Sequence, residues 1–153
     1  MLVHDEAKAS DAPILIIEDS DEDFEACVVA LQDGDAPETR VIRCETGDDA
    51  MAFLGKLSEE PKQSDSPCMI LLDLNLPGYS GFDILDRVKN DPRLKPIPVV
   101  IMTSSRNRAD VDACYRNGAN SYVHKPVDLD GFFSTIKRLR DFWFRIALLP
   151  DAK

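Results

Sequence analysis

The sequence has no long apolar run and no excess of basic residues. None of its apolar runs reaches the roughly 18 residues of a membrane helix, and its N-terminus, "MLVHDEAKASDAP", lacks the basic and apolar regions of a signal peptide. The formal net charge is −10 at pH 7, whereas proteins that bind nucleic acid concentrate Lys and Arg on one face. We therefore expect a cytoplasmic protein with neither membrane nor nucleic acid among its partners.

Histidine and paired cysteine are also scarce. The two histidines, His4 and His124, lie far apart in the sequence, and none of the four cysteines forms a C-x-x-C pair. These patterns are not those of a zinc or redox site. We expect reduced thiols inside the core at positions Cys27, Cys44, Cys68 and Cys114.

Apolar segments of strand length alternate with amphipathic segments along the chain. Five strands and five helices are predicted, the strands over 13–19, 39–45, 68–72, 97–104 and 121–126 and the helices over 21–35, 47–57, 81–91, 108–119 and from about residue 128 onward. Successive strand-then-helix units imply right-handed crossovers and an α/β fold with helices on both faces of a parallel sheet. The expected architecture is one doubly wound, flavodoxin-like (βα)5 domain, a five-stranded sheet with strand order 2-1-3-4-5.

An acidic residue closes the most apolar of these strands. The stretch "CMILLDLNLPG" (68–78) runs through five apolar residues before it reaches Asp73. Burying an unpaired carboxylate is expensive, so this acid should lie at the open end of the strand or have a partner. In the order 2-1-3-4-5, ligands bind outside the carboxyl ends of the first and third strands. Because Glu18 and Asp19 end the first strand, the sequence predicts a crevice with three carboxylates.

Three carboxylates in one crevice repel one another. A pair at about 4 Å costs on the order of 4 kcal/mol at an effective dielectric constant of about 20. A divalent cation removes that cost, and ligation by oxygen alone favours Mg²⁺ over zinc. Since Mg²⁺ usually combines one or two carboxylates with a phosphoryl oxygen, the crevice is typical of a phosphoryl-transfer site.

The ends of the fourth and fifth strands carry groups that suit a phosphoryl group. The fourth strand ends in Thr103 and Ser104, whose hydroxyls can donate to a phosphoryl oxygen. The fifth ends in Lys125, a flexible point charge. The bond from Lys125 to Pro126 is a candidate cis peptide that would aim the ammonium inward.

Four short segments carry a family resemblance. "IIEDS", "LLDLNLPGYSG", "IMTSS" and "YVHKP" resemble the signature segments of response-regulator receiver domains, and the run from Asp73 to Gly81 fits the pattern D-x-N-x-P-x-x-x-G. The likeness assigns residues 13–145 to a receiver domain, with a flexible tail at 1–12 and an extension at 146–153. Longer stretches such as "YRNGANSYVHKPVDLDGF" look like the single-domain regulators that partner phytochrome-type sensor kinases.

The resemblance implies a phosphoacceptor and a metal site. Asp73 would attack the phosphohistidine of a sensor histidine kinase and form an aspartyl phosphate. Asp19, Asp73 and the main-chain carbonyl of Asn75 would hold Mg²⁺, with Glu18, where many receivers have Asp, acting through a bound water. The protein would assist its own phosphorylation and dephosphorylation without a separate substrate, so we do not expect an enzyme.

The resemblance also implies a switch. Lys125 would neutralise the phosphoryl charge, Thr103 would move to bond the phosphoryl group, and Tyr122 would change rotamer with it, in a population shift between two states. In the family, the residues at the positions of Asn75 and Ser105 help to set how fast the phosphoryl group hydrolyses.

Three alternatives share parts of this pattern. A haloacid-dehalogenase-type phosphatase also has a nucleophilic Asp after an apolar strand, but it needs a second Asp where this chain has Asn75. A flavodoxin-type FMN carrier needs a phosphate-cradling loop after the first strand, where "EDSDED" would repel the phosphate. A chemotaxis-type motor regulator stays open within the receiver family, because we expect no attached output domain and output would pass through a partner, a dimer or a phosphorelay.

The C-terminal stretch "DFWFRIALLPDAK" (141–153) has more large apolar residues than the last helix needs. The apolar stripe of that helix is formed by Leu129, Phe132, Phe133, Ile136, Leu139 and Trp143. Other apolar side chains fall outside this stripe or at its margin. Such groups usually mark an interaction surface, so we expect a symmetric homodimer unless the segment folds back over its own core. The residues expected at the interface are Phe142, Phe144, Ile146, Leu148 and Leu149.

Overall fold

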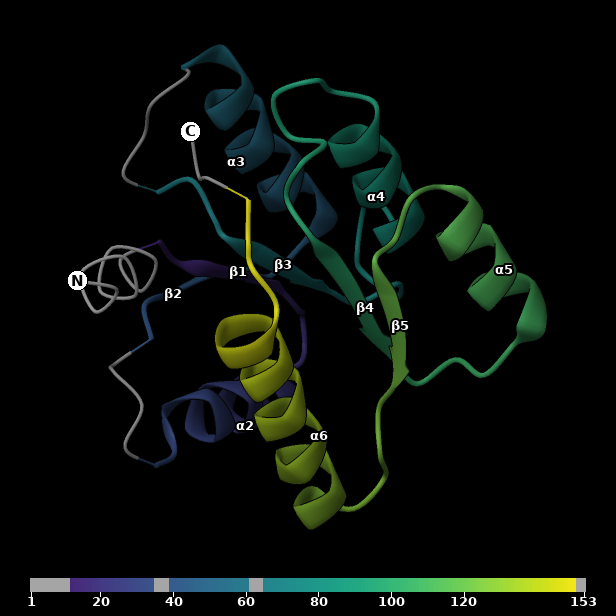
Figure 1. The fold of residues 1–153 in the computed structure, drawn as a ribbon. Helices are drawn as coiled ribbons and strands as arrows, with labels where there is room; N and C mark the ends of the chain where they lie inside the picture. The colour runs from purple at the N-terminus through teal and green to yellow at the C-terminus, as the bar shows by residue number, and fades with distance from the viewer. Residues whose placement is uncertain (1–11, 35–38, 61–64, 151–153) are drawn as a thin grey trace, which may run out of the picture.

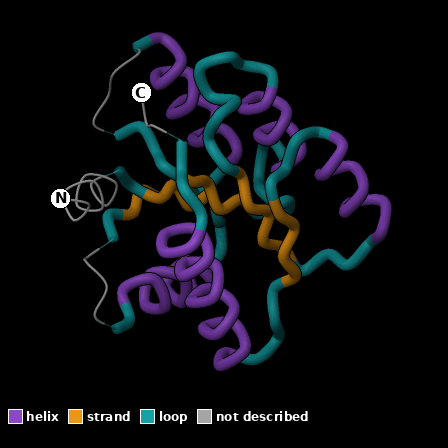
Figure 2. Tube along the Cα trace, viewed as in Figure 1, coloured by secondary structure: helices purple, strands orange, loops and turns teal. Residues whose placement is uncertain are grey.

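A computed structural model describes residues 12–34, 39–60 and 65–150 (Figure 1). Strands and helices alternate along the chain, and loops connect them (Figure 2). The elements are β1 (Ile14–Ile17), α2 (Asp21–Gln32), β2 (Val41–Cys44), α3 (Gly47–Glu59), β3 (Met69–Leu72), α4 (Gly81–Lys89), β4 (Val99–Thr103), α5 (Arg108–Arg116), β5 (Ser121–His124), α6 (Leu129–Asp141) and a π-helical turn, η1 (Phe142–Ile146). The ten predicted elements are therefore present, with strands shorter than expected. The predicted tail at 1–12 lies outside the described residues, apart from Ala12.

The five strands form one parallel sheet in the order β2-β1-β3-β4-β5, which confirms the predicted topology. β1 pairs with both β2 and β3, so Ile17 lies between Cys44 and Leu72. At the other side of the sheet Thr103 pairs with His124. This register brings the carboxyl ends of β1, β3, β4 and β5 to a common edge.

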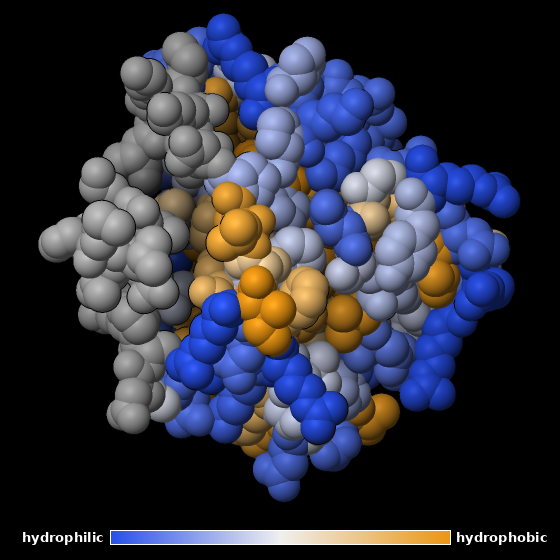
Figure 3. Space-filling model, in the orientation of Figure 1, coloured by the Kyte–Doolittle hydropathy of each residue, from blue (hydrophilic) through white to orange (hydrophobic). Residues whose placement is uncertain are grey.

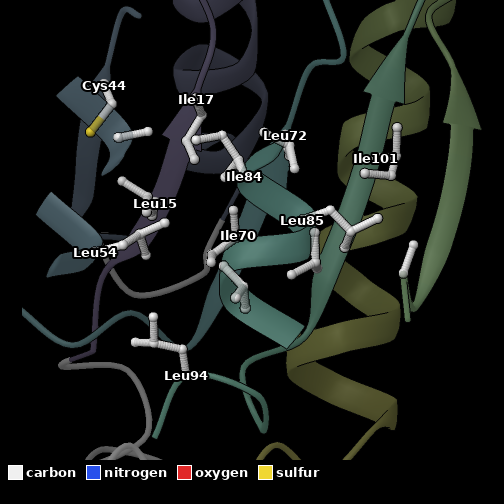
Figure 4. Close-up of a cluster of buried hydrophobic side chains, with 14 of the residues drawn as sticks. Leu15, Ile17, Cys44, Leu54, Ile70, Leu72, Ile84, Leu85, Leu94 and Ile101 are labelled. Carbon is white, nitrogen blue, oxygen red and sulfur yellow. The ribbon is translucent and has the colours of Figure 1, made fainter. Parts of the chain in front are cut away.

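Side chains that alternate along the strands build two cores, one on each face of the sheet. Leu15, Ile17, Ile70 and Leu72 point to the face covered by α3, α4 and α5, and Figure 4 shows them packed with leucines and isoleucines of α3 and α4. Ile14, Ile16 and their neighbours point to the opposite face, which α2 and α6 cover (Figure 1). Burial of each such side chain contributes about 2 kcal/mol, so the unbroken apolar runs of the sequence fit a sheet covered on both faces.

Each of the five α-helices in the described part of the chain begins with a side-chain cap. Ser20, Thr46, Ser80, Asn107 and Asp128 each accept a hydrogen bond from a main-chain N–H in the first turn of the helix. A cap of this kind contributes about 1 kcal/mol. Apart from the loop over residues 73–80, the caps follow the strands within a few residues, so the loops at the carboxyl edge are short and their acidic residues have fixed positions.

The helix α6 buries a narrower stripe than its sequence predicted. Phe132 and Ile136 are buried, but Leu129, predicted to belong to the stripe, is 60% exposed in the first turn. A charged residue, Arg140, is buried in the last turn of α6, where its guanidinium donates to the carbonyls of Ala30 and Asp33 at the end of α2. Arg140 of α6 thus caps the C-terminal end of α2 and joins the two helices on this face.

The four cysteines are buried and unpaired, as expected of core thiols. Burial, with a further contribution from Glu18, raises the pKa of the Cys27 thiol to about 12. Within the described residues, no helix combines the length and apolar character needed to cross a membrane.

Gly81 lets the chain pack closely against the loop that follows β3. Its N–H donates to the carbonyl of Leu74 at 3.0 Å. A Cβ at this position would lie 2.2 Å from the carbonyl oxygen of Asp73 and 2.6 Å from the Cα of Leu74. These are main-chain atoms that cannot rotate away, so only glycine fits here.

We predict that Gly81→Ala lowers the free energy of unfolding by about 2 kcal/mol or more, because relief of the clash requires a main-chain shift. Urea denaturation followed by circular dichroism measures the change. Gly55→Ala is the matched control: Gly55 lies within α3, a Cβ there meets nothing within 4 Å, and the change should stabilise the protein by about 0.5–1 kcal/mol. Equal effects at the two positions would contradict this packing.

Candidate functional site

The parallel hydrogen-bond ladder extends one residue beyond three strands and carries polar residues to the common edge. The main-chain N–H of Glu18 donates to Cys44 at 3.1 Å, that of Asp73 to Ile17 at 3.1 Å, and that of Lys125 to Thr103 at 2.8 Å. Glu18 and Asp73 are nearly buried, with 4% and 7% of their surface exposed. The side chains at this edge are therefore held by the sheet itself.

The structure brings together the three carboxylates that the sequence predicted. Glu18, Asp19 and Asp73 each place one carboxylate oxygen within 4.8 Å of those of the other two. Glu18 and Asp73 are buried and Asp19 is exposed, so the cluster is open to solvent on one side. All of its donors are oxygens, which suits a hard divalent cation.

Lys125 is the positive charge at the centre of this edge. Its Nζ donates to Glu18 Oε1 at 2.5 Å, to Asp23 Oδ2 at 2.8 Å and to Asp73 Oδ2 at 2.9 Å. An ammonium has three N–H donors, so each of them has a carboxylate partner. Only 11% of the side chain is exposed, and charge-assisted bonds in such surroundings are strong.

Asp23 is the residue that sequence reasoning missed. The acids at the start of the helix predicted from residue 21 favour the first turn of a helix, and the sequence assigns Asp23 no place among the site residues. The main-chain N–H of Asp23 donates to the Ser20 cap at 3.2 Å, and this cap sets where the Asp23 side chain lies. No spacing in the sequence signals the contact with Lys125, because Glu18 and Asp19 precede the Ser20 cap and lie outside the helix that carries Asp23, and Lys125 is 102 residues away.

The titration of the buried pair reflects opposing causes. Burial raises the pKa of Glu18 to about 7; the charge of Asp73 adds to this rise and the hydrogen bond from Lys125 opposes it. Burial also acts to lower the pKa of Lys125, but the hydrogen bonds to Asp23 and Glu18 outweigh it and hold this pKa above its usual value. The ammonium therefore stays charged and is the main counter-charge of the acids.

Two details of the main chain bear on this edge, and the first corrects a prediction. The bond from Lys125 to Pro126 is trans, so the predicted cis peptide is wrong. A trans bond suffices because the main chain of Lys125 continues the ladder with β4, from which its side chain reaches all three acids. Asn75 is exposed, and its main-chain N–H donates to Asp73 Oδ1 at 3.2 Å.

Thr103 and Tyr122, the two predicted switch residues, have contrasting environments. Thr103 is fully buried, and its Oγ1 is one of two buried side-chain polar atoms without a hydrogen-bond partner in the described part of the chain. The hydroxyl of Tyr122 donates to the carbonyl of Ser105 at 2.9 Å, and burial raises its pKa. Ser104, the other predicted hydroxyl, is exposed.

The fold and this edge define a class of protein. The sequence model of the response regulator receiver domain family matches residues 14–137, so the chain belongs to that family. Response regulator Rcp1 from Synechocystis sp. is 37% identical to it over 139 residues, which are 91% of this chain and 93% of that protein.

Solved structures of similar proteins agree with the family and the fold. The phosphorylated cyanobacterial phytochrome response regulator RcpA has a TM-score of 0.84 at 35% identity, over 92% of this chain and 99% of that chain. The Mn²⁺-bound form of response regulator Rcp1 has a TM-score of 0.82 at 35% identity, with the same coverage of both chains. The resemblance to the receiver family and to phytochrome response regulators is thereby confirmed.

We predict that Thr103→Val raises the free energy of unfolding by about 1 kcal/mol, because it removes a buried hydroxyl that has no partner and keeps the shape of the side chain. Chemical denaturation measures the difference. The same change at a hydroxyl in use, Thr46→Val, removes the cap of α3 and should destabilise by about 1 kcal/mol. A loss of stability at Thr103 similar to that at Thr46 would show that its hydroxyl is already satisfied.

Proposed function

We propose that the protein is a response regulator of a two-component system or phosphorelay that accepts a phosphoryl group on Asp73 from a sensor histidine kinase, with Mg²⁺ bound. The observation that carries this proposal is the position of the Asp73 carboxylate, which accepts a hydrogen bond from Lys125 and shares a cluster with Glu18 and Asp19. An acid held beside one strong cation and two further acids suits a nucleophile for phosphoryl transfer.

The transfer is one substitution at phosphorus. A carboxylate oxygen of Asp73 forms a bond to the phosphorus of a phosphohistidine, and the bond from phosphorus to the imidazole nitrogen breaks, with its electron pair leaving on the imidazole. Negative charge on the phosphoryl oxygens then falls beside the Lys125 ammonium, 2.9 Å from Asp73 Oδ2. The burial of Asp73 limits the access of water to the reacting carboxylate.

The residues present fit Mg²⁺. Glu18, Asp19, Asp73 and the main-chain carbonyl of Asn75 would hold the ion, which would neutralise the acids and the oxygens of the transferring group. Support comes from the three clustered carboxylates of this chain and from the Mn²⁺ in the similar structure of Rcp1. Mg²⁺ suits this site because its donors are all hard oxygens.

The unpartnered hydroxyl of Thr103 supplies a switch. A buried hydroxyl without a hydrogen-bond partner is costly, and a phosphoryl oxygen on Asp73 offers it an acceptor. Bonding to that oxygen would stabilise a second arrangement of the β4–α5 loop, in which Tyr122 leaves its present contact with the carbonyl of Ser105. Phosphorylation then shifts a population by making contacts that only one of two states provides.

The kinase partner follows from the family, since receiver domains of this kind interact with sensor histidine kinases. We infer a phytochrome-type kinase, and the support for it is the similarity to RcpA at 35% identity over nearly the whole of both chains. The signal would pass on through a partner protein, a dimer or the next carrier of a phosphorelay.

The region after α6 supports a homodimer through a smaller set of residues than the sequence suggested. Phe144 and Leu149 are partly buried against the core beneath α2 and α6, as expected if the segment folds back. Phe142, Ile146 and Leu148 remain exposed, and Leu148 is 99% exposed. Figure 3 shows apolar side chains gathered on this face, over the end of α6 and the chain that follows it. A second copy of the chain would cover these three residues.

We predict that Asp73→Asn abolishes phosphorylation, because an amide oxygen is too weak a nucleophile. The protein is incubated with phosphoramidate and Mg²⁺, and intact-protein mass spectrometry counts the phosphoryl groups. Wild type should gain a single group. Asp112→Asn, at an exposed position on α5, is the control and should label as wild type does. Undiminished labelling of Asp73→Asn would disprove the proposed function.

We also predict that wild type sediments as a dimer at micromolar concentration and that Phe142→Glu with Leu148→Glu gives a folded monomer. Both side chains are exposed in the single chain, so the charges should disturb only an interface. Val127→Glu with Leu129→Glu is the matched control, since these two apolar residues are also exposed, near the start of α6. A monomeric wild type, whether phosphorylated or not, would contradict the dimer.

A further inference from the structure

Asp23 differs from the other two acids that bind Lys125. Glu18 and Asp73 belong to the carboxylate cluster suited to a divalent cation, and Asp23 does not. It also lies further from the interior: its side chain is 36% exposed, compared with 6% for Glu18 and 8% for Asp73. The ammonium therefore has two partners inside the cluster and one at its margin.

The carboxylate oxygens of the two inner acids, Glu18 and Asp73, all accept hydrogen bonds already. Glu18 accepts from Lys125 through Oε1 and from the main-chain N–H of Ser20 through Oε2. Asp73 accepts from Lys125 through Oδ2 and from the main-chain N–H of Asn75 through Oδ1. All four oxygens already have a donor, so a cation that binds these acids draws on the same oxygens as Lys125.

Asp23 is the one partner of Lys125 that would not bind a cation in the carboxylate cluster. Lysine is a point charge on a flexible four-carbon stem with three rotatable donors, so it needs a fixed acceptor to stay in place when the inner acids change partners. Asp23 is such an acceptor because the first turn of α2, capped by Ser20, fixes its main chain. The contact with Lys125 joins α2 to the end of β5, 102 residues further along the chain.

We propose that Asp23 is a positioning residue that holds the Lys125 ammonium at the margin of the site while a divalent cation and then a phosphoryl group occupy Glu18 and Asp73. This inference rests on the proposed function. It assigns Asp23 two effects. Asp23 reduces competition between Lys125 and the cation, and it keeps Lys125 within reach of the phosphoryl oxygens.

The first test uses Mn²⁺ alone, with free Mn²⁺ measured by electron paramagnetic resonance on the unphosphorylated protein. Without Asp23, the ammonium rests only on the acids that the cation needs, so Asp23→Ala should weaken Mn²⁺ binding on the order of tenfold, as loss of an outer partner of a metal site commonly does. Glu22→Gln is the matched control. Glu22 is exposed in the same turn and is not among the three carboxylates bonded to Lys125. It removes an equal charge and should change the affinity by less than about twofold.

The second test separates positioning from attraction of the cation. Phosphorylation by phosphoramidate is followed at saturating Mg²⁺, where a weaker affinity no longer limits the rate. A misplaced Lys125 should still slow Asp23→Ala several-fold, with Asp23→Asn between it and wild type because the amide oxygen keeps an acceptor without the charge. Circular dichroism verifies the fold of each variant, and Asp23→Asn keeps both tests decisive if the alanine variant is unfolded.

Two results would overturn the inference while leaving the proposed function intact. One is a loss of affinity in Asp23→Ala that Glu22→Gln reproduces. The other is wild-type Mn²⁺ binding together with a wild-type rate at saturating Mg²⁺. A wild-type protein that neither binds Mn²⁺ nor becomes phosphorylated would overturn the proposed function and this inference with it.

Discussion

The ion cluster around Lys125 is the interaction on which the rest of the site depends. One ammonium bonds three carboxylates from the starts or ends of three different elements, and a fourth acid, Asp19, lies beside them. Breaking one partner of a buried pair leaves an uncompensated charge, so these side chains constrain one another. The parallel sheet makes the cluster possible, because its ladder carries Glu18, Asp73 and Lys125 one residue past the strands to a common edge.

This arrangement leaves the site with excess negative charge and one unused donor. Four carboxylates face a single ammonium, which favours a divalent cation. The buried hydroxyl of Thr103 has no partner in the structure described above, which favours a state in which it gains one. Cation binding and phosphoryl transfer therefore act on imbalances that the resting fold already contains. Tyr122 belongs to β5, the strand that pairs with β4 and therefore lies beside Thr103. A change at one carboxylate that moves Thr103 thus reaches Tyr122.

The sequence predicted the fold and most of the site because the two share one pattern. Unbroken apolar runs mark strands buried on both faces, and their order sets the edge at which Glu18, Asp19, Asp73, Thr103 and Lys125 meet. Prediction from the sequence failed where a side chain has more than one plausible partner. Asp23 was interpreted as a helix-start charge because a linear pattern does not show that α2 begins within reach of β5. A Lys-Pro pair cannot reveal its isomer, and the apolar residues after α6 divide between core and surface through packing that no periodicity records.

The central claim is that this edge of the sheet makes an acyl phosphate on one particular acid. The most direct measurement is to treat the protein with phosphoramidate and Mg²⁺, reduce the product with borohydride, and locate the reduced residue by tandem mass spectrometry. Reduction converts an acyl phosphate to an alcohol and leaves free carboxylates unchanged. The account predicts reduction at Asp73 and at no other acid, and only when Mg²⁺ is present. Reduction at Asp19 or Asp23 instead, or none at all, would contradict it.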